Sequence, residues 1–253
     1  MDKLQELCSE LNSMAQSKTS SGFGVEVATC AYLDLADLDS LEDNCRRILK
    51  DFNGDGPPDV LINCAGISSR GQALDTRLDV YQSLLAVNFL GHVVVSRAVA
   101  EAMLAAGRPG TIIAVSSLQG LLAIPSRSAY AASKHALQAY FDSFRAEVSN
   151  RRIRVIVASM TYIRTNLSMN ALTSKGKKHG VMDPTTARGM SPETVARRIL
   201  DGTAAGKQEL LIADGCGRLI YPLAVVFRHL WPSAYFWAMA RRARKEQRQQ
   251  PQL

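Results

Sequence analysis

The chain has 253 residues, of which 47% are hydrophobic, and this is enough apolar sequence to bury one full core. Its formal net charge is +7, but the sequence has neither a stacking-aromatic pattern nor a nucleic-acid motif, so nucleic-acid binding is excluded as a leading interpretation. Five scattered cysteines lack the spacing of a zinc site or a disulfide framework. We therefore expect reduced cysteines and no metal. The first residues also lack the apolar run of a signal peptide.

Helical and extended patterns alternate along the chain. An amphipathic helix is expected over residues 4–14, ended by Gly22, and a strand follows over residues 25–35. The later helices are expected at 38–52, 77–106, 128–149 and 192–205, and the later strands at 60–62, 111–116, 153–158 and 209–213. Such alternation predicts an α/β fold with a parallel, Rossmann-like, doubly wound sheet. We expect this domain over residues 1–215 and an amphipathic, basic helical tail over residues 216–253.

Polar residues follow the ends of four expected strands. Asp34, Asn63, Ser117 and the segment 161–165 each occupy such a position. Ligands of open α/β sheets bind beyond the carboxyl ends of the strands. The four positions therefore predict one site at a single edge of the sheet.

Tyr130 and Lys134 are four residues apart on an expected helix, so they share one helical face. A free tyrosine has a pKa of about 10 and is a poor acid or base at neutral pH. A neighbouring cation lowers such a pKa by about one to three units. An ammonium beside the phenol, helped by a positively charged nicotinamide ring, would make the tyrosine a usable acid and base for hydride chemistry at a carbonyl.

These residues resemble the short-chain dehydrogenase/reductase family. The resemblance covers nearly the whole chain and lies in Asn63-Cys64-Ala65-Gly66, Asn88, Ser117, Tyr130 and Lys134. It implies that Tyr130 is the general acid/base and that Lys134 lowers its pKa. It also implies that Ser117 binds the substrate carbonyl and that Asn88 holds a water molecule linking Lys134 to solvent.

The same resemblance implies an NADP or NAD cofactor, with NADP favoured by the family alone. Tyr130 and Lys134 would contact it, and Lys134 would hold the nicotinamide ribose. Asp34 would lie beside the adenine. The remaining cofactor contacts implied by the resemblance are Asn63, Ala65, Gly66, Ile163 and Thr165.

Other interpretations of these residues remain open. Tyr130 and Lys134 alone could be a surface pair, and Asn88 could be a helix-to-helix hydrogen bond in the core. Asp34 could cap the next helix. Ser116 competes with Ser117 for the substrate carbonyl, although the spacing to Tyr130 favours Ser117.

The chain departs from the family in two places. Thr161 stands where the family has glycine, and a β-branched side chain there would crowd the cofactor. The glycine-rich turn that cradles a pyrophosphate is not found, since Gly22-Phe23-Gly24 precedes a strand instead of a helix. We expect an N-terminally truncated domain without the first strand, the first helix and the second strand. Such a chain would fold marginally and bind dinucleotide poorly.

The last third of the sequence contains two features that match no catalytic motif. The polar stretch 160–190 resembles the family's mobile substrate lid, and an ordinary surface loop is the alternative. The tail has apolar residues next to aromatics and arginines, which suits an interfacial helix pair on anionic lipid. A helix packed on its own domain or in a homodimer is the alternative.

The tail and the flanks of the Tyr130 motif resemble one branch of the family. Members of this branch are tethered to the endoplasmic reticulum membrane by an N-terminal helix, and a cytoplasmic location follows if that helix is essential. Two functions are compatible with the sequence. The first is an oxidoreductase that interconverts a carbonyl and a secondary alcohol on an apolar, lipid or steroid-like substrate. The second is an inactive truncated fragment that associates with an intact subunit.

Overall fold

A computed structural model describes residues 2–16, 28–51, 56–215 and 217–249. The helices are α1 (Asp2–Gln16), α2 (Leu38–Asp51), α3 (Leu78–Leu85), the π-helical turn η1 (Ala86–Leu90), α4 (Gly91–Ala105), the 3-10 turn η2 (Leu118–Gly120), α5 (Ser128–Glu147), α6 (Pro184–Ala187), α7 (Pro192–Ala204), α8 (Gly217–Leu230) and α9 (Pro232–Gln249). The strands are β1 (Val60–Asn63), β2 (Ser69–Arg70), β3 (Gly110–Val115), β4 (Ile153–Met160), β5 (Leu172–Thr173) and β6 (Glu209–Ile212).

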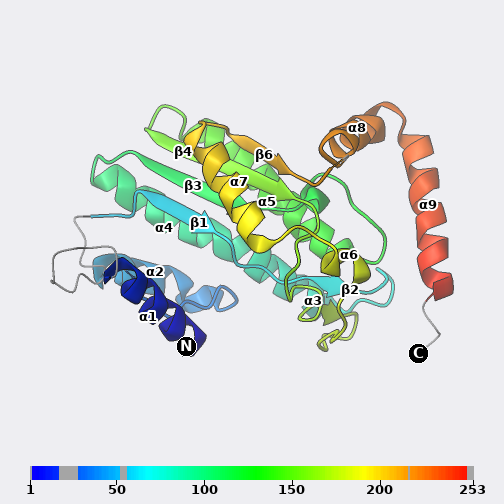
Figure 1. The fold of residues 1–253 in the computed structure, drawn as a ribbon, viewed down its shortest axis with the longest axis horizontal. Helices are drawn as coiled ribbons and strands as arrows, with labels where there is room; N and C mark the ends of the chain where they lie inside the picture. Colours follow the sequence, from blue (N-terminus) through cyan, green and yellow to red (C-terminus); the bar gives the residue numbers. More distant parts are fainter. Residues whose placement is uncertain (1, 17–27, 52–55, 216, 250–253) are drawn as a thin grey trace.

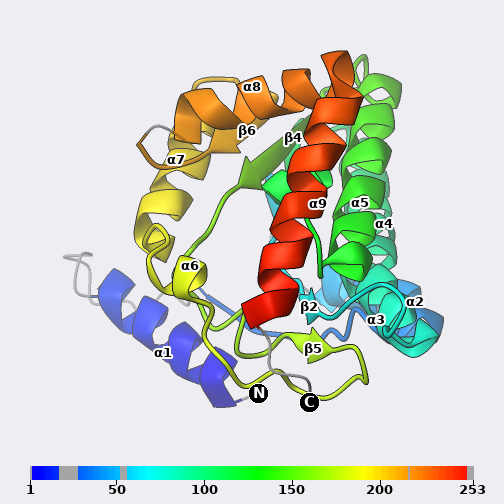
Figure 2. The same cartoon turned by 90° about the vertical axis from the view of Figure 1, so that its right-hand side faces the viewer.

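The main sheet is parallel and has the strand order β1-β3-β4-β6. Helices α4 and α5 cover one face and α7 covers the other, as Figures 1 and 2 show. The Rossmann-like α/β prediction is therefore confirmed. Strands β2 and β5 form a separate short parallel pair that the sequence pattern did not predict.

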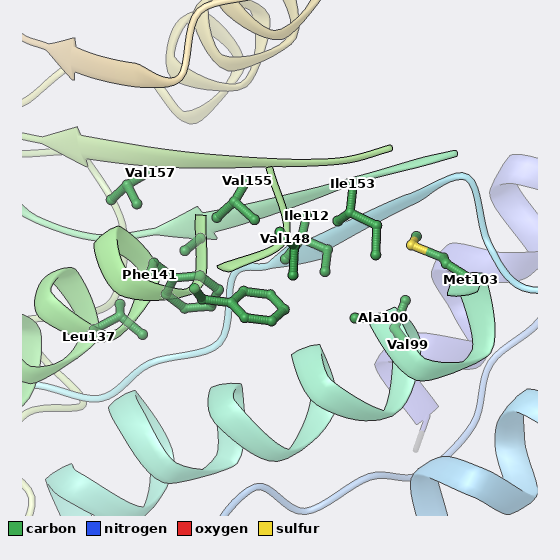
Figure 3. Close-up of a cluster of buried hydrophobic side chains, with 12 residues drawn as sticks. Val99, Ala100, Met103, Ile112, Leu137, Phe141, Val148, Ile153, Val155 and Val157 are labelled. Atoms are coloured by element: carbon green, nitrogen blue, oxygen red, sulfur yellow. The ribbon is translucent and has the colours of Figure 1, made fainter. Parts of the chain in front are cut away.

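The core between the sheet and its α4–α5 face contains buried aliphatic and aromatic side chains from α4, β3, α5 and β4, together with Val148. Phe141 extends from α5 into the space between the strands and α4, and it is fully buried (Figure 3). Ile112, Val155 and Val157 of the central strands pack around it. Strand β3 is a nearly continuous buried run because both of its faces are covered.

The strand expected over residues 25–35 is wrong for its described part, residues 28–35, which contain neither strand nor helix. A strand requires a neighbour for its backbone hydrogen bonds, and the part of the chain that the structure describes supplies none beyond β1. Leu33 and Leu35 instead pack on the α2–α4 cluster. Residues 25–27, Gly22 and the Gly22-Phe23-Gly24 stretch lie outside the described residues.

The free edge of β1 is apolar and exposed. Val60 and Ile62 are 48% and 46% exposed, and no described strand pairs with this edge. The apolar stripe of α1, which includes Leu4, Leu7 and Leu11, is also exposed. Both surfaces are unusual for a folded domain, in which exposed apolar strand edges favour association.

One continuous helical stretch, Leu78–Ala105, is long and apolar enough to cross a membrane by length and composition. Half of its most apolar window is buried inside the protein, where it packs on α2, α5 and the sheet. This packing is that of a central core helix.

We expect Phe141→Ala to lower the free energy of unfolding by about 3–5 kcal/mol, because the change removes a fully buried ring and leaves a cavity. Chemical denaturation followed by circular dichroism measures the effect. Leu74→Ala is the control, since Leu74 is 98% exposed and its loss should change stability by less than about 0.5 kcal/mol. Equal effects of the two substitutions would contradict the assignment of this core.

Candidate functional site

Side chains of α4 hold the turn after β1 in place. Asn63 is buried, and its amide donates to Ser96 Oγ at 2.8 Å. His92 is fully buried, and its Nε2 lies 3.0 Å from the carbonyl oxygen of Ala65. Burial, and secondly the charge of Lys134, lower the pKa of His92 to about 4. A neutral His92 therefore donates its Nε2 proton to Ala65 and holds the turn, a role that the sequence analysis missed.

Asn88 lies in the π-helical turn η1 and is completely buried. Its Oδ1 accepts from the Ile67 backbone at 2.8 Å, and its Nδ2 donates to the Ile67 carbonyl at 2.9 Å and to Ser133 Oγ at 3.0 Å. Asn88 thus ties the loop after β1 to helix α5. π-helical turns often occur at functional sites. The water-holding role of Asn88 stays a prediction.

Ser117 and Tyr130 meet beyond the carboxyl end of β3. Ser117 caps η2, with its hydroxyl accepting from the Gln119 backbone at 3.1 Å. Tyr130 is buried in the first turn of α5. Burial raises the pKa of Tyr130, while a hydrogen bond from Ser117 and the charges of Arg70 and Arg127 act in the opposite direction. The Ser117 hydroxyl therefore lies near enough to the phenol to stabilise its charged form.

Lys134 lies one helical turn after Tyr130 and is also buried. Its ammonium donates to the Val115 carbonyl oxygen at 3.0 Å. Burial lowers the pKa of Lys134 to about 8, and Cys64 opposes this shift. The charges that lower the Tyr130 pKa in the structure are those of Arg70 and Arg127. Lowering of this pKa by Lys134 stays a prediction.

A cavity of about 430 Å³ connects most of these groups. The predicted site residues that line it are Ala65, Gly66, Ser117, Tyr130, Lys134, Ile163 and Thr165. Asn63 and Asn88 support its wall from behind, through the bonds described above. Thr161 also lines the cavity, at the position where the family has glycine.

Asp34 lies apart from this cavity. Its carboxylate is exposed and accepts from the Ala36 backbone at 2.8 Å, which closes a turn before α2. The residue that contacts the first turn of α2 is Asp37, through Ser40, so Asp34 does not cap that helix. The adenine role of Asp34 stays a prediction.

The sequence analysis missed a charged cluster on the cavity wall. Asp183 in the lid segment accepts from Arg70 Nε at 2.9 Å and from Arg127 at 3.3 Å. Arg70 and Asp183 are 113 residues apart, and no local pattern predicts such a pair. The cluster ties the segment 160–190 to the domain and places positive charge near Tyr130.

The cavity residues fit the nicotinamide half of a dinucleotide. Gly66 keeps the space beside the Lys134 ammonium open, because a Cβ there would lie 3.8 Å from Lys134 Nζ and 3.3 Å from Asn88 Oδ1. A ribose hydroxyl suits this position as a hydrogen-bond acceptor for the ammonium. The described residues contain no glycine-rich turn at a helix N-terminus for the pyrophosphate.

Comparison with known proteins gives a consistent result. The family model for short chain dehydrogenases matches residues 3–176. A Drosophila melanogaster protein named Dehydrogenase/reductase SDR family protein 7-like is 45% identical over 84% of this chain and 63% of its own length. Dehydrogenase/reductase SDR family member 7B from Bos taurus is 43% identical over 98% of this chain and 72% of its own length. The chain thus spans about two thirds to three quarters of these relatives.

Solved structures share the fold. A short-chain dehydrogenase from Streptomyces avermitilis superimposes with a TM-score of 0.70 over 92% of this chain and 85% of its own, at 21% identity. A 4-hydroxyisoleucine dehydrogenase complexed with NADH has a TM-score of 0.59 and 26% identity over 73% of this chain and 79% of its own.

The pKa of Lys134 predicts a pH dependence of stability. The folded pKa of about 8 lies below the unfolded value of about 10.4, so between these values the unfolded chain binds more protons and stability rises with pH. Between pH 8 and 9.5 we expect the wild type to gain about 1–2 kcal/mol relative to Lys134→Met. Denaturation midpoints across this range measure the difference. A constant or falling difference would contradict the buried, partly deprotonated lysine.

Proposed function

The chain belongs to the short-chain dehydrogenase family, and we propose that it is an NAD(P)-dependent oxidoreductase that interconverts a carbonyl and a secondary alcohol. The observation that carries the proposal is the Ser117–Tyr130 pair at a cavity that Lys134 also lines. A hydroxyl near a buried phenol is a proton-transfer arrangement next to a space for a reacting carbonyl.

The residues have separate roles in this reaction. Ser117 and Tyr130 bind the carbonyl oxygen, and the Tyr130 hydroxyl donates its proton to that oxygen in the reduction. The cofactor, when bound, supplies the hydride to the carbonyl carbon. In the reverse direction, Tyr130 accepts the alcohol proton. After the reduction, Tyr130 would regain a proton from solvent through Lys134 and a water molecule held by Asn88, and in the oxidation the proton would leave by the same route.

The cofactor in this proposal is NADP or NAD, with NADP favoured by the family resemblance. Lys134, Ile163 and Thr165 would contact the nicotinamide half, and the Asn63–Gly66 turn would support it. Asp34 would contact the adenine. The relative complexed with NADH supports the cofactor class.

An apolar substrate suits the rest of the cavity. Its wall beyond the polar groups is formed largely by apolar side chains, including Leu118, Leu122, Ile124 and Met160. Such a lining favours a lipid or steroid-like carbonyl compound over a small polar one.

We also propose contact of the α8–α9 tail with a membrane surface, and by family resemblance we place the protein at the endoplasmic reticulum. The homodimer considered for this chain stays a prediction.

Removal of the phenol or of its partner tests the chemistry. We expect Tyr130→Phe to lower the rate of NAD(P)H-dependent ketone reduction by about 10²–10⁴-fold, because it removes the proton donor. Ser117→Ala should also lower the rate. Ser116→Ala decides between the two serines, since Ser116 also lines the cavity and its hydroxyl is buried without a hydrogen-bond partner in the described structure. Under the assignment to Ser117 it should leave the rate unchanged. Loss of rate in Ser116→Ala with Ser117→Ala unaffected would overturn the assignment.

The exposed β1 edge favours a second candidate, an inactive fragment that associates with an intact subunit. Val60 and Ile62 are available for pairing, and no glycine-rich turn is present in the described residues. Under this candidate, titration with NADPH should show weak or no binding, and the chain should co-purify with an intact relative. Val60→Lys/Ile62→Lys should abolish that association, whereas Leu74→Lys/Leu200→Lys, on exposed positions elsewhere, should preserve it. Tight NADPH binding with a cooperative melt would rule this candidate out.

A further inference from the structure

Helices α8 and α9 lie beyond the carboxyl ends of the strands (Figures 1 and 2). Residues of both helices line the cavity as part of its wall. From α8 the cavity is lined by Ile220, Tyr221 and Ala224, and from α9 by Tyr235, Met239 and Arg242. On each helix these residues recur within one or two helical turns, so they lie on the same side of the helix, which we call its inner face. The last two helices therefore belong to the space that contains Tyr130.

The other side of these helices is also apolar, and it faces solvent. Leu223 and Leu230 are 67% and 62% exposed, and Trp231, Phe236 and Trp237 are more than half exposed. No residue of α8 is buried. Packing within the described protein thus leaves these side chains, which we call the outer face of the two helices, uncovered, and large exposed apolar side chains gathered on two adjacent helices indicate an interaction surface.

The charge of the tail indicates which surface covers this face. From Gly217 to Lys245 the sequence contains six cations and no aspartate or glutamate. Arg242 lines the cavity, whereas Arg241, Arg244 and Lys245 are exposed on the same helix. The Arg241 guanidinium lies over the Trp237 ring at 4.8 Å from its centroid. Indole rings with adjacent cations and exposed leucines are complementary to the headgroup and acyl boundary of an anionic bilayer.

The attachment of this wall to the domain is narrow. Tyr235 is the one buried side chain of α8 and α9 among the residues described there, at 6% exposure. Its hydroxyl donates to the Ala123 carbonyl at 3.1 Å. Ala123 belongs to the loop that connects the Ser117 turn to α5. Displacement of the helices would therefore open the cavity next to its catalytic groups.

We propose that the outer face of α8 and α9 docks on a bilayer containing anionic lipid and that an apolar substrate passes from the bilayer into the cavity through this wall. The docking stands on the exposed apolar and basic residues alone. The entry route rests on the proposed function, because it assumes that the cavity receives an apolar substrate.

Intrinsic fluorescence tests the docking directly, since Trp231 and Trp237 are the two tryptophans of the chain and both lie on the outer face. Vesicles of phosphatidylcholine and phosphatidylserine should shift the emission to shorter wavelength, and brominated acyl chains should quench it. Vesicles of phosphatidylcholine alone should give a much weaker response. An unchanged emission with anionic vesicles would overturn the docking.

Variants of exposed leucines on and off the outer face show which surface binds the vesicles. Leu223→Asp/Leu230→Asp should weaken vesicle binding by about tenfold or more, because it removes apolar contact and adds repulsion. Leu78→Asp/Leu200→Asp is the control, since Leu78 and Leu200 are 73% and 56% exposed on other helices. Equal weakening in both variants would overturn the assignment. A concentration-dependent emission shift without vesicles would show that a second copy covers the face instead.

Cys64 reports on the entry route. Its thiol is exposed and lines the cavity, whereas Cys8 lies on α1. On anionic vesicles, a long-chain alkyl maleimide in the bilayer should label Cys64 several-fold faster relative to Cys8 than it does in detergent solution, measured by peptide mass spectrometry. Leu223→Asp/Leu230→Asp should remove this preference. A vesicle-bound protein without the preference would overturn the entry route. Neither cofactor nor turnover enters the measurement, so its failure is distinguishable from failure of the proposed function.

Discussion

The burial of one face of α5 is the interaction on which the site depends. Tyr130, Lys134, Leu137 and Phe141 follow one another at spacings of four, three and four residues, so they share one side of the helix. Leu137 and Phe141 pack into the core beneath the sheet. This packing fixes the rotation of α5, and it thereby places the phenol and the ammonium at the carboxyl ends of the strands. The chemistry at one end of the helix is thus positioned by apolar packing at the other.

This positioning has an electrostatic cost. Burial disfavours the charged forms of both Tyr130 and Lys134, raising one pKa and lowering the other. The protein offsets the cost with specific contacts, which are the Val115 carbonyl for the ammonium and Ser117 for the phenol. Perturbed groups with specific partners in a cavity are typical of functional sites. A surface pair, the alternative considered for these two residues, would show neither burial nor these partners.

The sequence allowed prediction of the features that depend on local patterns. The alternation of extended and helical patterns along the chain predicted β3, β4, α5 and α7. Features that depend on residues far apart in the sequence could not be predicted from it. The segment 28–35 has an extended pattern, but the described residues supply no neighbouring strand for it to pair with. Arg70 meets Asp183 only through the tertiary fold. The inner and outer faces of α8 and α9 could not be separated either, because both are apolar and only the cavity distinguishes them.

The direction of the Tyr130 shift also bears on the direction of the proposed reaction. A raised pKa keeps the phenol protonated at neutral pH, and a protonated phenol is the form that donates to a carbonyl oxygen. Alcohol oxidation needs the opposite form, a phenolate, which burial disfavours here. Arg70 and Arg127 reduce this preference, and Asp183 partly neutralises them through its contacts with both. In the proposed role, the free protein therefore holds Tyr130 in the form that donates a proton, and Arg70 and Arg127 limit the rise of its pKa.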